Sequence, residues 1–235
     1  MNKLIMLLIA ALISGNAFAQ FTSEDEVSLL STGGNTDVKT YDLQSDNKYI
    51  FDKNSIQLKG HYTFSESDSE RNAENWDITL RYDHVLSATL ETFVAQGVES
   101  NRFSGYARRY NSDLGLKYTL IKTEKNETFS EFGFRYTIED DVDDSVEDSK
   151  DYKGRLYAET KQEFNKTVSA KFWAEYIPNF TESSKYLVNM EPSLAVSMTK
   201  VFSLKIAYLW NYSNVPPKGN SSSDYKYTTS ILANF

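Results

Sequence analysis

The chain has 235 residues, with 33 acidic and 25 basic side chains, a formal net charge of -8 and no cysteine. The acidic balance argues against nucleic-acid binding through a basic surface, and the lack of thiols excludes disulfides and cysteine-based metal sites. The mean hydropathy of -0.51 is typical of a soluble protein, but a transmembrane β-barrel can share that value because only alternate residues of its strands face lipid.

The first residues predict a secretory signal peptide. Lys3 precedes an apolar run over residues 4–13, which is too short to span a bilayer as a helix, and Ala17, Phe18 and Ala19 then form an A-x-A cleavage site. We expect cleavage after Ala19, so that residues 1–19 are the signal peptide and residues 20–235 form one outer-membrane β-barrel domain. Roughly 215 mature residues suit a single all-β domain.

Apolar or aromatic side chains recur at every second position in about twelve segments, which predicts β-strands. In chain order these segments cover residues 27–31, 38–49, 56–64, 76–82, 90–98, 110–120, 132–138, 152–164, 168–176, 186–198, 202–212 and 225–235. The last segment alternates up to its terminal Phe235 and resembles the closing strand of a bacterial outer-membrane barrel. The predicted fold class is all-β, a transmembrane antiparallel up-and-down β-barrel of about twelve strands.

The connections alternate in length, as in barrels with long outer loops and short periplasmic turns. Residues 65–75, 99–108 and 139–151 are predicted long loops, whereas residues 83–87, 122–127 and 165–166 are predicted short turns. Aromatic side chains occur at both ends of the lipid-facing rows, as expected for rings at the two membrane interfaces. The loop-proximal set includes Phe64, Trp76, Tyr110, Tyr136, Tyr152, Tyr176, Tyr186, Trp210 and Tyr225, and the turn-proximal set Tyr49, Tyr82, Tyr118, Phe164, Phe202 and Phe235. A soluble β-sandwich would explain the alternation but not two such belts.

The residues between the lipid-facing positions are predicted to line the lumen. The basic ones are Lys48, Lys59, Arg81, Arg109, Lys117, Arg135, Lys153, Arg155, Lys161, Lys171, Lys205 and Lys226, and the acidic ones are Asp42, Asp46, Asp77, Asp83, Glu91, Asp113, Glu131, Glu159, Glu175 and Glu191. Because the two sets nearly balance, we expect ion pairs across neighbouring strands. About eight strands give a filled interior and 16–18 an aqueous channel, so charged side chains in a twelve-stranded barrel either plug the lumen or leave a narrow path.

The net negative charge is expected in the loops, above all in residues 139–151, where eight of the thirteen side chains are acidic. Ca²⁺ prefers several carboxylate oxygens, so weak binding of divalent cations is one interpretation of this segment. It lacks the ordered spacing and the mid-loop glycine of an EF-hand. A solvated, mobile loop is the favoured interpretation, because runs of like charge repel.

The sequence contains few groups of residues that could form a catalytic site. The two histidines are His61, predicted to point into the lumen, and His84, predicted in a short turn beside Asp83. Neither is accompanied by a recognisable nucleophile motif, and no glycine-rich phosphate loop or zinc motif occurs. The sequence therefore predicts no enzyme, no cofactor and no catalytic metal.

Short motifs carry a family resemblance. Gly34, Asn35 and Thr36 follow the first strand, Glu99, Arg102 and Phe103 precede Arg109, and the run Gly115-Leu116-Lys117-Tyr118 comes next. The chain resembles the salt-induced outer-membrane protein family, a domain of unknown function of Gram-negative bacteria. The resemblance implies an outer-membrane location and a link to salt or osmotic conditions, but no reaction, cofactor or substrate. One departure is Asn101, where the family pattern has aspartate. If that aspartate pairs with Arg102 or Arg109 in relatives, the asparagine weakens the pair in this chain.

The physical interpretation of these motifs is structural. Gly33, Gly34 and Asn35 suit a tight hairpin that needs positive φ, and Arg102 and Arg109 are expected to pin the following loop through charge-assisted hydrogen bonds.

The sequence predicts an integral outer-membrane barrel of unknown specific role that acts as an envelope protein or a narrow pore for small solutes or ions. The alternatives are an outer-membrane hydrolase with a site at the acidic outer rim and a soluble periplasmic ligand-binding barrel. Expected partners are the bilayer, its lipopolysaccharide and, through Phe235, the barrel-assembly machinery. The candidate lumen or loop residues are Arg81, Arg102, Arg109, Asp113, Glu131, Arg135, Glu159 and Glu175.

Overall fold

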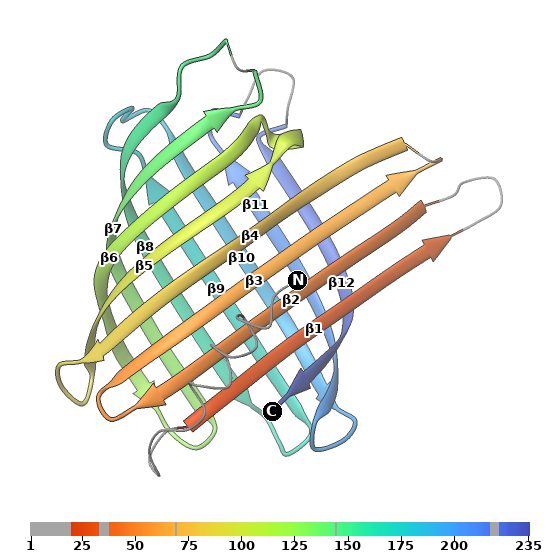
Figure 1. Ribbon diagram of the computed structural model, residues 1–235. Helices are drawn as coiled ribbons and strands as arrows, with labels where there is room; N and C mark the ends of the chain where they lie inside the picture. The colour runs from red at the N-terminus through yellow and green to blue at the C-terminus, as the bar shows by residue number, and fades with distance from the viewer. Residues whose placement is uncertain (1–19, 33–37, 69, 144, 217–220) are drawn as a thin grey trace, which may run out of the picture.

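The computed structural model describes residues 20–32, 38–68, 70–143, 145–216 and 221–235. The described residues form twelve antiparallel strands that close into one barrel, in which β1 pairs with β12 and every other pair is consecutive in the chain (Figure 1). The strands are β1 Gln20–Thr32, β2 Val38–Phe51, β3 Asn54–Ser67, β4 Glu70–Val85, β5 Leu90–Asn101, β6 Tyr106–Lys122, β7 Asn126–Asp141, β8 Ser149–Glu163, β9 Val168–Pro178, β10 Tyr186–Ser197, β11 Phe202–Ser213 and β12 Ser223–Asn234, with a 3-10 helix η1 at Arg102–Ser104. The predicted all-β up-and-down barrel is confirmed.

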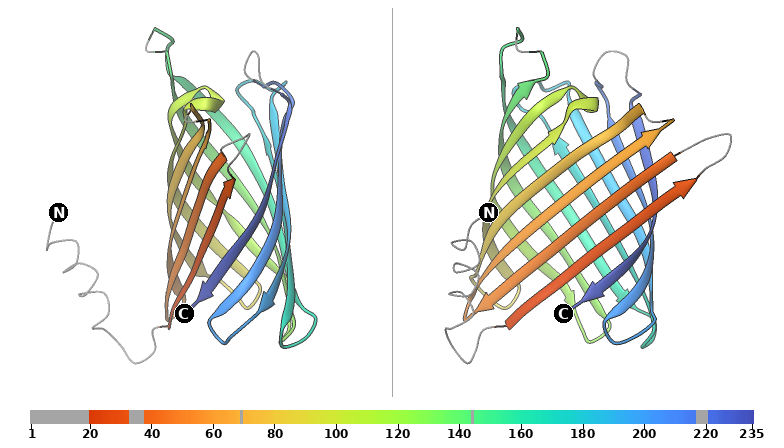
Figure 2. Two further views of the ribbon diagram at one scale, coloured as in Figure 1. Left: turned by 90° about the vertical axis from the view of Figure 1, so that its right-hand side faces the viewer. Right: turned by 45° about the vertical axis from the view of Figure 1, so that its right-hand side comes forward.

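The two ends of the barrel differ. At one end, which we call the turn end, lie the start of β1, Phe235 and the connections 52–53, 86–89, 123–125, 164–167 and 198–201 (Figure 2). Side chains of the sequence close these turns: the Asn165 amide oxygen accepts hydrogen bonds from the backbone N–H groups of Thr167 and Val168, and the Thr199 hydroxyl oxygen does so from Phe202. The opposite end, the loop end, includes residues 142–143, 145–148, 179–185, 214–216 and 221–222. The predicted signal peptide, residues 1–19, and the predicted hairpin at Gly33, Gly34 and Asn35 lie outside the described residues.

One predicted long loop, residues 65–75, is wrong. Strand β3 continues to Ser67 and β4 begins at Glu70, so the two strands pair as far as Ser67 with Glu70. The prediction ended both strands where apolar alternation stops, but a β-ladder needs only backbone partners and continues through polar residues. Predicted loop 99–108 likewise shrinks to η1 and Gly105, whose φ of 94° suits glycine.

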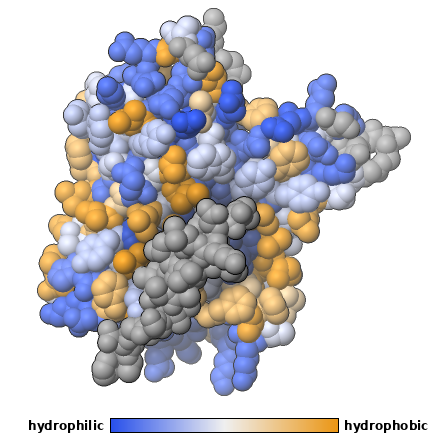
Figure 3. Space-filling view, in the orientation of Figure 1, coloured by the Kyte–Doolittle hydropathy of each residue, from blue (hydrophilic) through white to orange (hydrophobic). Residues whose placement is uncertain are grey.

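The outer wall is apolar. Exposed leucine, isoleucine, valine and phenylalanine side chains occur on strand after strand, among them Leu43, Leu58, Leu80, Val94, Leu114, Phe132, Leu156, Phe172, Leu194, Ile206 and Ile231. Figure 3 shows hydrophilic residues gathered over the loop end and hydrophobic residues over the wall below it. An exposed apolar surface of this extent is typical of contact with a membrane. No helix within the described part of the chain is long and apolar enough to cross a membrane.

Exposed aromatic side chains lie near the strand ends, as the two predicted belts require. Tyr152 and Tyr225 are exposed near the loop end, and Tyr118, Phe202 and Phe235 are exposed near the turn end.

The interior of the barrel is polar. Glu26, Asp42, Asp83, Glu131 and Lys205 are buried there. Among the described residues, no buried side-chain nitrogen or oxygen is left without a hydrogen-bond partner. The lumen is therefore lined by a satisfied polar network, the condition for burying so many charges.

The seam between β1 and β12 is the shortest ladder. Its register extends only from Glu24 with Asn234 to Val27 with Ile231, whereas β1 and β2 pair over the whole length of β1. Figure 2 shows β1 and β12 converging at the turn end and diverging toward the loop end. Closure at this seam therefore depends on side chains as well as on the backbone.

Candidate functional site

A group of five charged side chains, which we call the central network, lies on the inner wall formed by β4 to β9, with its members on β4, β7, β8 and β9. The Arg81 guanidinium lies 2.7 Å from an Asp83 carboxylate oxygen and 2.8 Å from one of Glu131. The Arg155 guanidinium lies 2.6 Å from Glu131 and 2.5 Å from Glu175. Glu131 is thus shared by two arginines, and the chain of ion pairs links four strands. Such multiply bonded pairs hold their side chains in fixed positions.

An aromatic ring packs against Arg81 of this network. Phe93 is only 1% exposed, and the Arg81 guanidinium lies 4.0 Å from its ring centre. Phe93 pairs across the sheet with Gly115, which pairs with Gly133. A Cβ atom at Gly115 would lie 2.6 Å from the Phe93 ring, so the ring can lie over the wall only because glycine is there.

Further polar contacts extend the network. Arg135 donates two hydrogen bonds of 2.7 Å to the Asp113 carboxylate. The Tyr157 hydroxyl donates to Glu159 at 2.5 Å, and its ring stacks on Trp173 with centroids 6.0 Å apart. The wall formed by β4 to β9 is therefore crowded with large, mutually bonded side chains.

Near the loop end, Arg109 holds three elements together. Its guanidinium lies 3.2 Å from a Glu99 oxygen and 2.6 Å from a Glu139 oxygen, and 3.7 Å from the ring centre of Tyr106. These partners lie on strands β5, β6 and β7, so the contacts join neighbouring strands, whereas the sequence predicted that Arg109 pins the following loop. Arg102, predicted to share that role, lies exposed in η1 and is not part of this cluster.

Asn101 has a local structural role. Its side-chain oxygen accepts a hydrogen bond of 3.0 Å from the backbone N–H of Ser104, so it caps η1.

His61 points into the lumen, as predicted, and lies between two carboxylates. Its Nδ1 is 3.1 Å from Asp77 and its Nε2 is 3.2 Å from Asp42. The Thr63 hydroxyl is 3.0 Å from Nε2, a spacing that a nucleophile and its base would have. It is closer to Asp42, to which it donates at 2.6 Å, and Lys226 also donates to this carboxylate at 2.6 Å. The hydroxyl is therefore one donor to a buried structural carboxylate.

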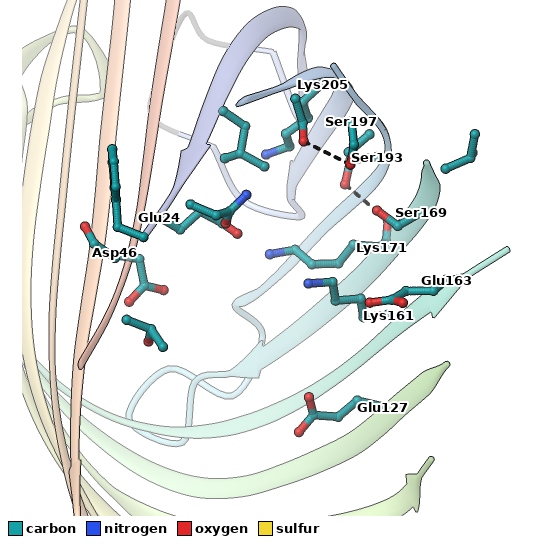
Figure 4. A pocket seen from close by; sticks show the side chains of 18 of the residues that line it. Glu24, Asp46, Glu127, Lys161, Glu163, Ser169, Lys171, Ser193, Ser197 and Lys205 are labelled. Carbon is teal, nitrogen blue, oxygen red and sulfur yellow. Dashed lines mark hydrogen bonds between the residues drawn. The ribbon is translucent and has the colours of Figure 1, made fainter. Parts of the chain in front are cut away.

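A cavity of about 590 Å³ occupies the lumen at the turn end. Lysine side chains from β8 and β9, Lys161 and Lys171, point into it, and Glu24 and Asp46 lie across from them (Figure 4). Phe235 also lines it. The lumen is therefore crowded at the level of the central network and open at the turn end.

The acidic segment 139–151 forms no metal site among its described residues: the part of the chain that the structure describes holds no group of three or more acidic or histidine side chains placed to bind a metal ion. Glu139 is engaged by Arg109, and Asp151 lies 3.5 Å from Lys153. Asp144 lies outside the described residues. Weak binding of divalent cations by this segment stays a prediction.

The structure brings most of the predicted candidates together. Arg81, Glu131 and Glu175 belong to the central network, Asp113 and Arg135 form a pair, and Glu159 is held by Tyr157, whereas Arg109 lies apart from them in the cluster near the loop end. Sequence reasoning placed Arg155 in the lumen but not among the candidates, although it joins two of them. It missed Phe93, whose only signal is an aromatic residue in an inward-facing row that also contains glycine.

The described geometry can be compared with known proteins. A family described as a protein of unknown function, DUF481, matches residues 26–235, nearly the whole barrel. The chain belongs to the DUF481 family. No curated protein matches the sequence.

Two solved structures share the architecture of this DUF481 barrel. The NanC porin superposes with a TM-score of 0.53 at 10% identity, covering 92% of this chain and 98% of the porin. An outer-membrane channel from Pseudomonas putida F1 superposes with a TM-score of 0.54 at 9% identity, covering 94% of this chain and 97% of the channel. At these identities the likeness concerns the fold, which is that of outer-membrane β-barrels.

Proposed function

We propose that this protein is an integral outer-membrane barrel whose lumen is a narrow pore for small solutes or ions. The proposal rests on where side chains fill the lumen and where they leave it open. The central network crowds one wall, and a cavity of about 590 Å³ lies at the turn end. A lumen lined by charged groups favours the passage of hydrated solutes, and its bound charges set which sign of ion passes.

The central network is the proposed selectivity element. It contains two guanidinium groups and three carboxylates, so it carries net negative charge. Rings of carboxylates favour cations in pores. A weak cation preference is therefore expected at the level of the central network.

Single-channel recording in planar bilayers tests the proposal. The wild-type protein is expected to give small conductance steps. Arg155→Gln removes a positive charge and should raise the preference for cations, whereas Glu131→Gln should lower it. Lys53→Gln, in the exposed turn between β2 and β3, is the control and should behave as the wild type. Absence of any conductance from correctly folded protein would overturn the pore.

The predictions about export, membrane insertion and regulation belong to the same proposal. Export through a cleaved signal peptide, insertion by the assembly machinery through Phe235, contact with lipopolysaccharide and induction by salt all concern this barrel in its membrane. Fractionation and N-terminal sequencing of the mature protein test export and cleavage. Transcript levels after a shift to high salt test induction, and equal levels in both media would contradict it.

Catalysis has less support than transport. His61 is bonded to two carboxylates inside the lumen, and His84 bonds Asn54 at the turn end, so neither lies at the acidic loop end where the hydrolase alternative places its site. We propose that the barrel is not an enzyme.

A further inference from the structure

Two lysines face each other across adjacent strands at the turn end of the lumen. Lys161 on β8 and Lys171 on β9 are direct register partners, and both line the cavity. Figure 4 shows their side chains lying side by side, with both ammonium groups pointing into the cavity. Like charges directly opposite on neighbouring strands destabilise a sheet. This pair is thus unfavourable for the empty barrel.

The lysine pair is not neutralised within the described part of the chain. Of the basic side chains predicted to line the lumen, nine have a carboxylate oxygen within 4.0 Å. The other three are Lys48, Lys161 and Lys171, and all three line the same cavity. The lumen lysines without an ion pair among the described residues therefore lie together at the cavity, where there is room for a ligand.

Five carboxylates line the cavity, and within the described part of the chain none forms an ion pair with Lys161 or Lys171; two of them, Glu127 on β7, the register partner of Lys161, and Glu163 on β8, lie on the same wall as the lysines. Asp46 lies 3.2 Å from Lys59 and accepts a hydrogen bond of 2.6 Å from Gln57, and Glu159 is bonded to Tyr157. Figure 4 shows Glu24 on the wall opposite the lysines. The cavity is therefore lined by both signs of charge, with the lysine pair among Glu127, Glu159 and Glu163 on the β7–β9 wall and with Glu24 on the β1 wall.

We propose that Lys161 and Lys171 form a binding site for an oxyanion, the phosphate or carboxylate group of a small solute in the cavity at the turn end. Two ammonium groups supply charge-assisted hydrogen bonds to such a group, and the anion removes their mutual repulsion. The carboxylates on both walls of the cavity favour a small ligand whose negative charge is confined to the one group that the lysines bind. The site deepens the proposed pore, on which it rests, and an oxyanion that enters from the turn end reaches the lysines without crossing the negatively charged central network.

Calorimetric titration of the refolded full-length barrel in uncharged detergent tests the site, with inorganic phosphate as the probe at low ionic strength. Wild-type protein is expected to bind phosphate, and Lys161→Gln with Lys171→Gln should weaken binding by about tenfold or more, since two charge-assisted contacts are lost. Lys117→Gln, which removes a lumen lysine paired with Glu91, is the control and should leave binding unchanged, because neither residue lines the cavity. Equal affinity in the double variant, or no binding to the wild type, would overturn the site.

A stability measurement separates this site from a purely structural pair. Lys171→Glu places a carboxylate opposite Lys161, so the thermal midpoint should rise while phosphate binding is lost. A lower midpoint in this variant would contradict the repulsion on which the inference rests. Because titration is made in detergent without a bilayer, failure of the pore appears only as missing conductance, and failure of the site only as missing phosphate binding.

Discussion

Lys226 on β12 donates a hydrogen bond of 2.6 Å to Asp42 on β2, although β1 lies between these two strands. The contact passes over Ser28, the residue of β1 that pairs with Asp42. It therefore joins β12 to β2 across the seam on the inside of the barrel, beyond the short backbone ladder between β1 and β12. Nearer the turn end, buried Glu26 on β1 accepts from Lys205 on β11 at 2.7 Å and from Ser230 on β12 at 2.5 Å.

Removing the contact between Lys226 and Asp42 should destabilise the barrel. Lys226→Gln takes the cation from Asp42, which is only 2% exposed, and is expected to cost about 1.5–3 kcal/mol, the value of a hydrogen bond to a charged group. The temperature at which the folded band disappears on unboiled gels reports the loss. Lys59→Gln is the matched control, because its partner Asp46 is a third exposed and lies in a complete ladder. Equal transition temperatures for the two variants would contradict the role of the seam contact.

Gly115→Ala should destabilise the barrel by about 1–3 kcal/mol, the usual cost of overpacking. The new Cβ would lie 2.5 Å from the Phe132 carbonyl oxygen and 2.6 Å from the Phe93 ring, so the ring and the central network above it must move. Gly60→Ala is the control, because its nearest neighbouring atom is 4.0 Å away. Denaturant titration followed by tryptophan fluorescence measures both. A harmless Gly115→Ala would show that Phe93 is not held against the wall.

The three tryptophans should respond differently to lipid. Trp76 and Trp210 are predicted in the lipid-facing rows, whereas Trp173 stacks on Tyr157 inside the lumen. In variants that keep one tryptophan each, brominated lipid should quench Trp76 and Trp210 and leave Trp173 nearly unquenched, because the quencher acts over short distances. Strong quenching of Trp173 would contradict the inward orientation of β9. The fluorescence of the same variants in non-brominated lipid is the reference.

Arg109 and Arg102 should differ, although the sequence suggested the same role for both. Arg109→Ala leaves Glu99 and Glu139 facing each other without a cation and exposes the Tyr106 ring, so a loss of about 2–4 kcal/mol is expected. Arg102→Ala, in exposed η1, should change stability by less than about 0.5 kcal/mol. Thermal midpoints of the two variants decide, and similar losses would mean that Arg102 has a partner role.

The strand number and the inward row were predictable because both follow from period-two alternation. Once Leu114 and Leu116 face lipid, Asp113 must face the lumen, and its pairing with Arg135 follows from opposite charges at register positions. The same reasoning placed Glu131 and Arg81 inside. It could not select Arg155 as the residue that joins Glu131 to Glu175, because side chains that meet along a tilted wall depend on register.

Two features lay beyond alternation. The extension of β3 and β4 through Glu66 and Arg71 is polar on both faces, so no hydropathy signal marks it. Phe93 looks like a lipid-facing residue in composition, and only the paired glycines opposite it make room for a ring inside. A ring that packs into the space left by glycines on neighbouring strands cannot be recognised from a single sequence.

The seam also bears on the order of assembly. Its contacts join positions far apart in the chain, such as Ser28 and Thr229, which are 201 residues apart, whereas every other ladder joins consecutive strands. Closing so long a loop costs more chain entropy than adding a hairpin, so we expect the curved sheet to form first and the seam last. Contacts made after the rate-limiting step mainly slow unfolding. Lys226 and Glu26 are thus expected to set how long a finished barrel lasts, with little influence on how fast it forms.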